Sequence, residues 1–127
     1  MGEAGRNLWR MASTADTRRE KFPESYAIFD RLTAEYVQRE GVALGRMFGS
    51  EGLSIRGKVF AFVGFTGSLF AKLPEKRVGE LIENGDAEPA VMRDRPMREW
   101  VTARADRPDT WSGIVAEAYE FVDSITP

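Results

Sequence analysis

The sequence of 127 residues contains no cysteine and no histidine, and these two absences remove much of the usual chemistry of protein sites. Without cysteine, the chain cannot form disulfides, iron–sulfur clusters or cysteine-ligated zinc sites. Without histidine, a metal site would have to be built from oxygen ligands alone. We therefore expect no metal and no cofactor, and we expect the protein not to be an enzyme.

Long apolar runs are also absent, because no stretch approaches the roughly 20 apolar residues that a membrane-spanning helix needs. Arg6 and Arg10 near the N-terminus are not followed by the apolar segment of a secretory signal. We expect a cytoplasmic protein with no membrane partner. The net charge of −2 and the pI of about 5.3 differ from the basic character of domains that bind nucleic acid through its phosphates. Nucleic acid is therefore a less favoured partner than protein.

The composition divides the chain into a short tail and one domain. Residues 1–17 are rich in small and polar residues without a period, which predicts a disordered N-terminal tail. Residues 18–127 are long enough to form one domain with its own apolar core.

The spacing of apolar residues predicts the order helix, four strands, helix, two strands, helix. Spacings of three and four predict the helices, and a spacing of two predicts the strands. The connections between successive strands are too short for a parallel crossover, so the sheet is expected to be antiparallel. We predict helices over residues 18–40, 74–83 and 110–125; strands over 44–48, 53–56, 59–64, 68–73, 88–92 and 97–103; and turns over 49–52, 56–58, 65–67 and 93–96.

Four short segments carry a family resemblance. They are Met47-Phe48-Gly49, Leu53 to Phe62 around Gly57, Leu69 to Leu73, and Arg95-Pro96-Met97 with Trp100-Val101. Their order and spacing are similar to those of the N-terminal domain of the TfoX (Sxy) family of competence regulators. The resemblance covers residues 22–125.

This resemblance implies an α+β fold, a two-layer sandwich of an antiparallel sheet with helices mainly on one face, like the architecture of type III secretion chaperones. Full-length members are transcriptional coactivators in competence, which work with the cyclic-AMP receptor protein and carry a second, C-terminal domain. We expect this chain to be a stand-alone member that lacks that domain. The implied function is that of a non-enzymatic interaction module, with a role in transcriptional or competence regulation through protein contacts.

The strands do not show the alternation of apolar and polar residues that is typical of a sheet with one buried face and one polar face. In residues 59–63 both faces are apolar, and Phe70 is flanked by Leu69 and Ala71. Either the set Phe60, Phe62 and Phe70 or the set Val59, Ala61 and Val63 should therefore lie on the face away from the main helices. That face is covered by the tail or the C-terminal helix, or it is an interaction face for a homodimer or a protein partner.

A second candidate surface is the most basic stretch, residues 93–107, which carries five arginines. Together with two basic residues of the preceding hairpin, it could bind a small anion or nucleic acid, with Trp100 stacking on a base. The alternative is a solvated turn whose charges pair internally. The candidate anion-binding residues are Arg56, Lys58, Arg93, Arg95 and Arg98.

The remaining motifs favour structural roles. Gly49-Ser50-Glu51-Gly52 lacks the lysine of a phosphate-binding loop and is expected to be a hairpin turn. Trp100 and Trp111 are expected in or at the edge of the core, and Met47 and Met97 as gap-filling core residues. The acid–base candidates nearest these segments, which we expect to be surface charges, are Glu51, Glu88, Asp94 and Glu99.

Overall fold

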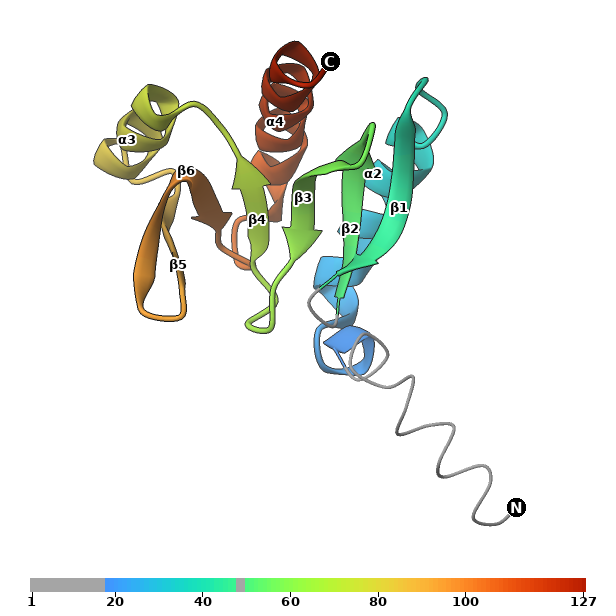
Figure 1. The fold of residues 1–127 in the computed structure, drawn as a ribbon. Helices are drawn as coiled ribbons and strands as arrows, with labels where there is room; N and C mark the ends of the chain where they lie inside the picture. The colour runs from blue at the N-terminus through green and yellow to red at the C-terminus, as the bar shows by residue number, and fades with distance from the viewer. Residues whose placement is uncertain (1–17, 48–49) are drawn as a thin grey trace.

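The computed structural model describes residues 18–47 and 50–127 and shows an α+β fold built on a six-stranded antiparallel sheet (Figure 1). The strands lie in the order β1-β2-β3-β4-β6-β5. The expected tail, residues 1–17, lies outside the described residues. The elements are α2 (Pro23–Tyr36), β1 (Val42–Met47), β2 (Ser50–Ile55), β3 (Lys58–Val63), β4 (Leu69–Lys72), α3 (Glu75–Glu83), β5 (Glu88–Met92), β6 (Arg95–Ala103), the 3-10 helix η1 (Pro108–Thr110) and α4 (Trp111–Ile125).

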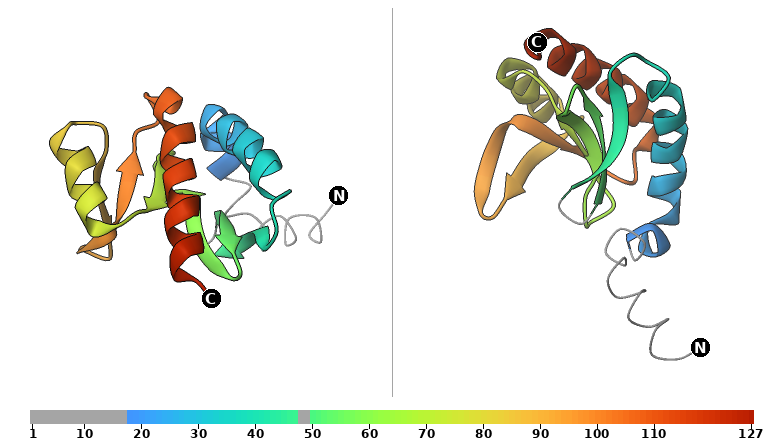
Figure 2. Two further views of the ribbon diagram at one scale, coloured as in Figure 1. Left: turned by 90° about the horizontal axis from the view of Figure 1, so that it is seen from above. Right: turned by 45° about the vertical axis from the view of Figure 1, so that its right-hand side comes forward.

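The predicted arrangement of an antiparallel sheet with helices packed on it is confirmed. Helices α2 and α4 lie behind the strands in Figure 1, and we call this side of the sheet the helix face. The opposite side, toward the viewer, is called the open face. Helix α3 packs against β5 and β6. Seen from above, α4 crosses the end of the sheet, so that its C-terminal turn reaches toward the open face (Figure 2).

The helix predicted over residues 18–40 is interrupted in the structure: residues 18–21 are helical, the helix breaks at Phe22, and α2 follows and ends before residue 40. Pro23 occupies its first turn, where a missing N–H costs nothing, and the helix ends at Tyr36. Gly41 lies in the turn before β1 with a φ of 82°. The Ser25 hydroxyl donates a 2.7 Å hydrogen bond to the carbonyl of Gly67, which attaches α2 to the β3–β4 loop.

The main core lies between the helix face and the helices. Trp111, at the start of α4, is fully buried, and its indole N–H donates a 3.1 Å hydrogen bond to the carbonyl of Arg104. The expectation that Trp111 is a core residue is confirmed. The largest other fully buried side chains are Tyr26, Phe29, Phe60, Leu53, Ile55, Leu69, Leu73, Val63, Val101, Val115 and Val122.

A bulge in β3 decides which apolar side chains reach each face. Leu53 pairs with Ala61, but the next residue of β2, Ser54, pairs with Val59, which leaves Phe60 as an extra residue in β3. The ring of Phe60 lies on the helix face, with its centroid 6.1 Å from that of Tyr36. The expectation that Phe60 shares a face with Phe62 is wrong, because the bulge shifts the alternation by one residue.

The same shift splits the second expected set. Ala61 and Val63 belong to the core of the helix face, whereas Val59 packs with Phe62 and Phe70 on the open face. Neither set that the alternation predicts is therefore kept together in the fold.

Two tight turns close hairpins with a positive φ at both central residues. They are Arg56-Gly57, with φ of 48° and 88°, and Arg93-Asp94, with φ of 52° and 64°. This geometry matches the twist of the flanking strands. The turn predicted over residues 49–52 is wrong, because residues 50–52 belong to β2 and Ser50 pairs with Met47. Residue 49 lies outside the described residues.

Candidate interaction surfaces

A groove opens on the open face where β3 and β4 separate. The two strands pair over only three residues each, from Val63–Leu69 to Ala61–Ala71. Beyond this point β3 remains paired with β2 as far as Lys58. Strand β4 remains paired with β6 as far as Lys72, which is opposite Trp100. The C-terminal turn of α4 crosses the end of the sheet here. The groove is therefore bounded by strands on both sides and by a helix end.

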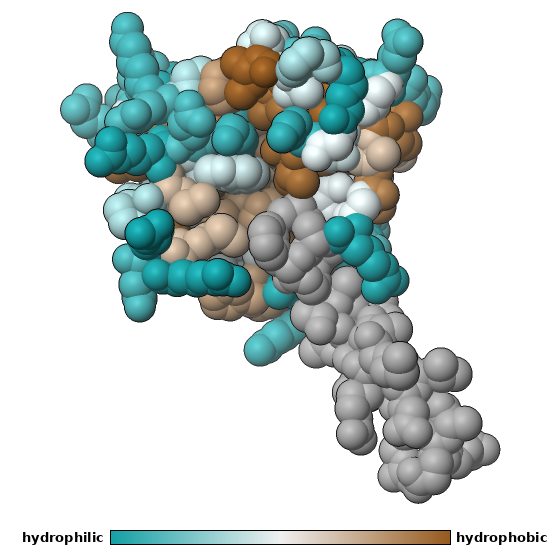
Figure 3. All heavy atoms as spheres, in the orientation of Figure 1, coloured by the Kyte–Doolittle hydropathy of each residue, from teal (hydrophilic) through white to brown (hydrophobic). Residues whose placement is uncertain are grey.

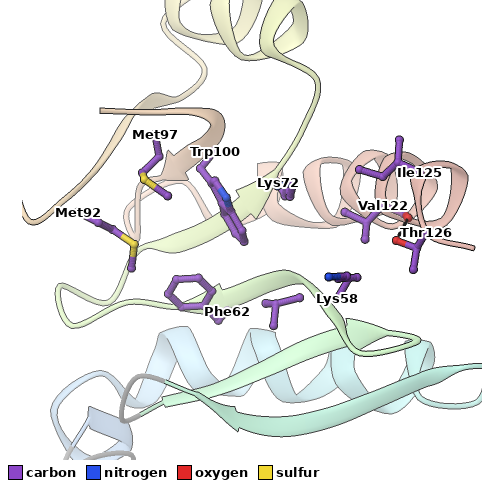
Figure 4. Close-up of a pocket in the computed structure, with 10 residues that line it drawn as sticks. Lys58, Phe62, Lys72, Met92, Met97, Trp100, Val122, Ile125 and Thr126 are labelled. Carbon is purple, nitrogen blue, oxygen red and sulfur yellow. Dashed lines mark hydrogen bonds between the residues drawn. The ribbon is translucent and has the colours of Figure 1, made fainter. Parts of the chain in front are cut away.

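The groove is a predominantly apolar cavity of about 480 Å³. Figure 4 shows the two methionines at one end, the α4 residues at the other, and the rings of Phe62 and Trp100 between them. Apolar surface among hydrophilic side chains is visible on this side of the molecule in Figure 3. The lining residues are Lys58, Val59, Phe62, Lys72, Met92, Met97, Trp100, Val122, Ile125 and Thr126.

Two of the three phenylalanines of the expected interaction face, Phe62 and Phe70, form the base of this region and not its surface. Phe62 and Phe70 stack with centroids 4.9 Å apart, and their side chains are only 5% and 9% exposed. They are covered by the β5–β6 hairpin through Ala90 and Trp100, and not by the tail or the C-terminal helix. Trp100 is half-buried at the edge of this cluster, as expected for a core-edge residue.

The sequence pattern did not indicate the contribution of α4 to the groove. Ile125 continues the apolar spacing of α4, which by itself would place the side chain in the core. In the structure it is 53% exposed, because β3 and β4 have separated where the helix end lies. Lys72 and Met92, which also line the groove, carry no distinguishing sequence signal.

Among the described residues, the charged side chains that line the groove are two lysines. The Lys72 ammonium lies 3.5 Å from the Glu99 carboxylate and 5.7 Å from the ring centroid of Trp100. Lys58 is exposed and has no ion pair among the described residues. No carboxylate lines the groove within the described part of the chain, so its electrostatic character is cationic.

Strand β1 is an edge strand, and no other strand of the described residues pairs with its outer side. Arg56 donates a 2.8 Å main-chain hydrogen bond to Gly41, which identifies the pair Gly41–Arg56 as hydrogen-bonded. By alternation, Val42, Leu44 and Arg46 direct their N–H and C=O groups away from β2. The Val42 N–H bonds to the carbonyl of Arg39. Leu44 and Arg46 are left as the open positions, and the Leu44 side chain is 38% exposed.

The opposite edge strand, β5, is protected in the ways that sheet proteins use against unwanted pairing. It contains Pro89, which has no N–H to donate, and a register shift between Pro89 and Val91. Strand β1 contains no proline and pairs with β2 in uninterrupted register. The two edges of the sheet therefore differ in their capacity to accept another strand.

Arg56, a candidate anion-binding residue, is engaged within the fold. Its guanidinium donates to the backbone oxygens of Asp123, Thr126 and Pro127 at 2.7 to 3.1 Å and to the Asp123 carboxylate at 2.8 Å. It therefore gives a second partner to the Asp123 carbonyl, which also accepts from the Thr126 N–H, and binds the two carbonyls that follow the end of α4. This role explains the arginine at the turn without a ligand.

The other candidate cations do not converge on one site. Arg93, Arg95 and Arg98 are exposed on the β5–β6 hairpin and make no ion pair within the described residues. The β5–β6 turn lies at the opposite end of the sheet from the β2–β3 turn beside Lys58 (Figure 1). Farther along the basic stretch, Arg104 pairs with Asp106 and Arg107 with Asp86. Of the candidate anion-binding residues, the hairpin arginines and Lys58 have no ion pair within the described residues and remain available to an external anion.

The carboxylates considered as acid–base candidates are dispersed. Glu51 pairs with Arg19, Glu88 lies 4.0 Å from Arg104, Glu99 pairs with Lys72, and Asp94 lies in the β5–β6 turn. Within residues 18–47 and 50–127, no three of the potential metal-ligating side chains lie close enough to hold an ion.

The shifts in pKa that the structure produces belong to ion pairs and to one buried phenol. Hydrogen bonds to Asp30 and Glu51 raise the pKa of Arg19, and burial raises the pKa of Tyr36. A side-chain hydrogen bond from Arg104 lowers the pKa of Asp106. None of these groups lines the groove.

The comparisons with known proteins returned no match: no protein-family model, no curated protein and no solved structure corresponds to this chain. Among the described residues, no helix has the length and apolar character required to cross a membrane.

Proposed function

We propose that this chain is a protein-interaction module of the TfoX N-terminal type, without catalytic chemistry of its own, which forms a homodimer through strand β1. Its role is in transcriptional or competence regulation, exerted in the cytoplasm through protein contacts. The observation that supports dimerisation is the difference between the two sheet edges. β1 leaves the main-chain groups of Leu44 and Arg46 open, whereas β5 is blocked by Pro89 and a register shift.

The chemistry of β1 fits a second copy of the same strand. In an antiparallel pair centred on Leu44, the two Leu44 side chains are opposite each other, and Arg46 is opposite Val42 of the partner strand. Apolar groups therefore meet at the centre, and the two Arg46 charges are kept apart. The exposed Val37, at the end of α2, adds apolar surface on the helix side, because α2 contacts β1. Main-chain hydrogen bonds supply the affinity, as in other cases of strand addition.

Sedimentation velocity over a series of protein concentrations tests this proposal. The wild-type chain is expected to form a dimer whose fraction rises with concentration. Leu44→Lys should give a monomer, because a lysine at an edge strand opposes pairing. Val91→Lys is the matched control, since Val91 is 54% exposed on the other edge strand; this variant should dimerise like the wild type. A wild-type monomer at every concentration, or a Leu44→Lys dimer, would contradict the proposal.

A second candidate function is the binding of a small anion or nucleic acid by the β5–β6 hairpin. The observation that favours it is that Arg93, Arg95 and Arg98 are exposed and have no ion pair among the described residues. Binding through phosphates depends steeply on salt, whereas strand pairing does not.

Adding a short DNA duplex to the sedimentation experiment at low salt separates the two functions. A DNA-bound species that dissociates as salt rises would support the second candidate. The double variant Arg95→Glu with Arg98→Glu should then abolish that species and leave the fold intact. An unchanged affinity of this variant for DNA would exclude the hairpin as the binding site.

A further inference from the structure

We propose that the groove on the open face is a binding site for a small carboxylic acid with an apolar body, such as a medium-chain or aromatic acid. This site is separate from strand β1 and does not depend on dimerisation. It is formed by parts of the chain that are distant in sequence: β3, the β4–β6 pair, the β5–β6 hairpin and the end of α4.

The size and lining of the groove support an apolar ligand body. Its volume of about 480 Å³ lies within the range of roughly 300–1,000 Å³ that is typical of small-molecule sites. The rings of Phe62 and Trp100 lie between Met97 at one end of the cavity and Ile125 at the other, and these four side chains give it an apolar lining (Figure 4). Methionine side chains adapt to ligands of different shape. Such a lining gains free energy by removing apolar ligand surface from water.

The charges of the groove decide the sign of the ligand headgroup. Lys58 and Lys72 are the charged residues that line it in the described part of the chain, and both lie near the end formed by α4 (Figure 4). The Lys72 ammonium is 3.5 Å from one carboxylate, that of Glu99, and retains further donor capacity. Lys58 has no ion pair within the described residues. A ligand carboxylate at this end would therefore meet two ammonium groups, with its apolar body directed toward Trp100 and the methionines.

The proposal can be tested with three probes in an NMR titration of the isotope-labelled full chain. Octanoate combines a carboxylate with an apolar chain, 1-octanol carries the same chain without the charge, and acetate carries the charge without the chain. Octanoate is expected to shift the Trp100 indole N–H resonance saturably, and Trp100→Phe identifies that resonance. 1-Octanol should bind about two- to five-fold more weakly, the contribution of exposed charges, and acetate should not shift the resonance.

Two matched variants connect this binding to the groove. Ile125 and Val91 are similarly exposed, at 53% and 54%, but only Ile125 lines the groove. Ile125→Glu should weaken octanoate binding by about five-fold or more, because it adds a negative charge beside the ligand carboxylate. Val91→Glu should bind octanoate like the wild type. Lys58→Gln should weaken octanoate about two- to five-fold and leave 1-octanol unchanged.

The opposite results overturn the proposal. Equal binding of octanoate and 1-octanol would show that the lysines do not select an anion, and equal binding of acetate would show that the apolar lining plays no part. Equal octanoate affinities of Ile125→Glu and Val91→Glu would place the ligand elsewhere. An Ile125→Glu variant that changes the sedimentation profile and not octanoate affinity would assign the groove to contact between copies. Leu44→Lys should not alter octanoate binding, so this test can fail independently of the dimer proposal.

Discussion

Arg56, in the turn between β2 and β3, holds the last turn of α4 through Asp123. Its Nη2 atom lies 2.8 Å from the Asp123 carboxylate and 2.9 Å from the Asp123 carbonyl oxygen. The two residues are 67 positions apart in the sequence, and their contact places the helix end beside the groove. A positive charge at a helix C-terminus also interacts favourably with the helix dipole.

Arg56→Ala is expected to destabilise the fold by about 1 kcal/mol, the typical net value of hydrogen bonds of this kind. Alanine, like arginine, has a Cβ that makes the positive φ at this position unfavourable. The change in unfolding free energy therefore reports the loss of the guanidinium contacts. Urea denaturation followed by circular dichroism measures the change. Arg95→Ala is the control, because Arg95 is exposed without an ion pair in the described residues, and it should change stability by less than about 0.5 kcal/mol. Equal effects of the two variants would contradict the capping role.

Gly64→Ala should destabilise the protein by about 1–3 kcal/mol, the usual cost of overpacking. A Cβ at this position would lie 2.4 Å from Cε1 of Phe70, whose ring is buried and stacked on Phe62. Gly79→Ala is the opposite case, because nothing lies within 4 Å of its added Cβ in helix α3. It should stabilise the protein by about 0.5–1 kcal/mol. Thermal unfolding of both variants checks the predicted difference in sign.

Phe62→Asp should unfold the domain and not simply release a partner, because Phe62 is 5% exposed beneath the β5–β6 hairpin. Truncating a buried phenylalanine alone costs about 3–5 kcal/mol, and a buried charge adds to that cost. Phe65→Asp is the matched control, since Phe65 is 72% exposed in the β3–β4 loop. It should keep the wild-type unfolding curve. A folded, monomeric Phe62→Asp variant would instead make Phe62 an interface residue.

Arg104→Gln should raise the pKa of Asp106 toward its ordinary value, because the Arg104 side-chain hydrogen bond is the main cause of its depression. A depressed carboxyl pKa contributes stability above the pKa of the unfolded chain, near pH 4, and this contribution is lost as the pH falls through the folded-state value. NMR titration of the Asp106 carboxyl measures the shift. Arg39→Gln, which removes a cation from a different region, should leave Asp106 unchanged.

Local sequence patterns determined the elements of this fold. The apolar stripe of α4 buries Trp111, Ile114, Val115, Ala118 and Val122, which recur at helical spacing. Helix α3 ends at Glu83, as predicted, and Gly85 follows with a φ of 79° that favours glycine. These features depend on residues within a few positions of one another. A helical period or a turn residue therefore suffices to predict them.

The tertiary structure alone decided where the faces of the sheet and its surfaces lie. The position of Phe60 depends on a bulge, and the bulge exists only in the pairing of β3 with β2. The groove depends on the separation of β3 from β4 and on the path of α4 across the gap. Arg56 resembles a free cation in the sequence, because the carbonyls that it binds lie at and just after the end of α4, 67 or more residues away. Such relationships arise from contacts between distant segments, which the pattern of neighbouring residues does not encode.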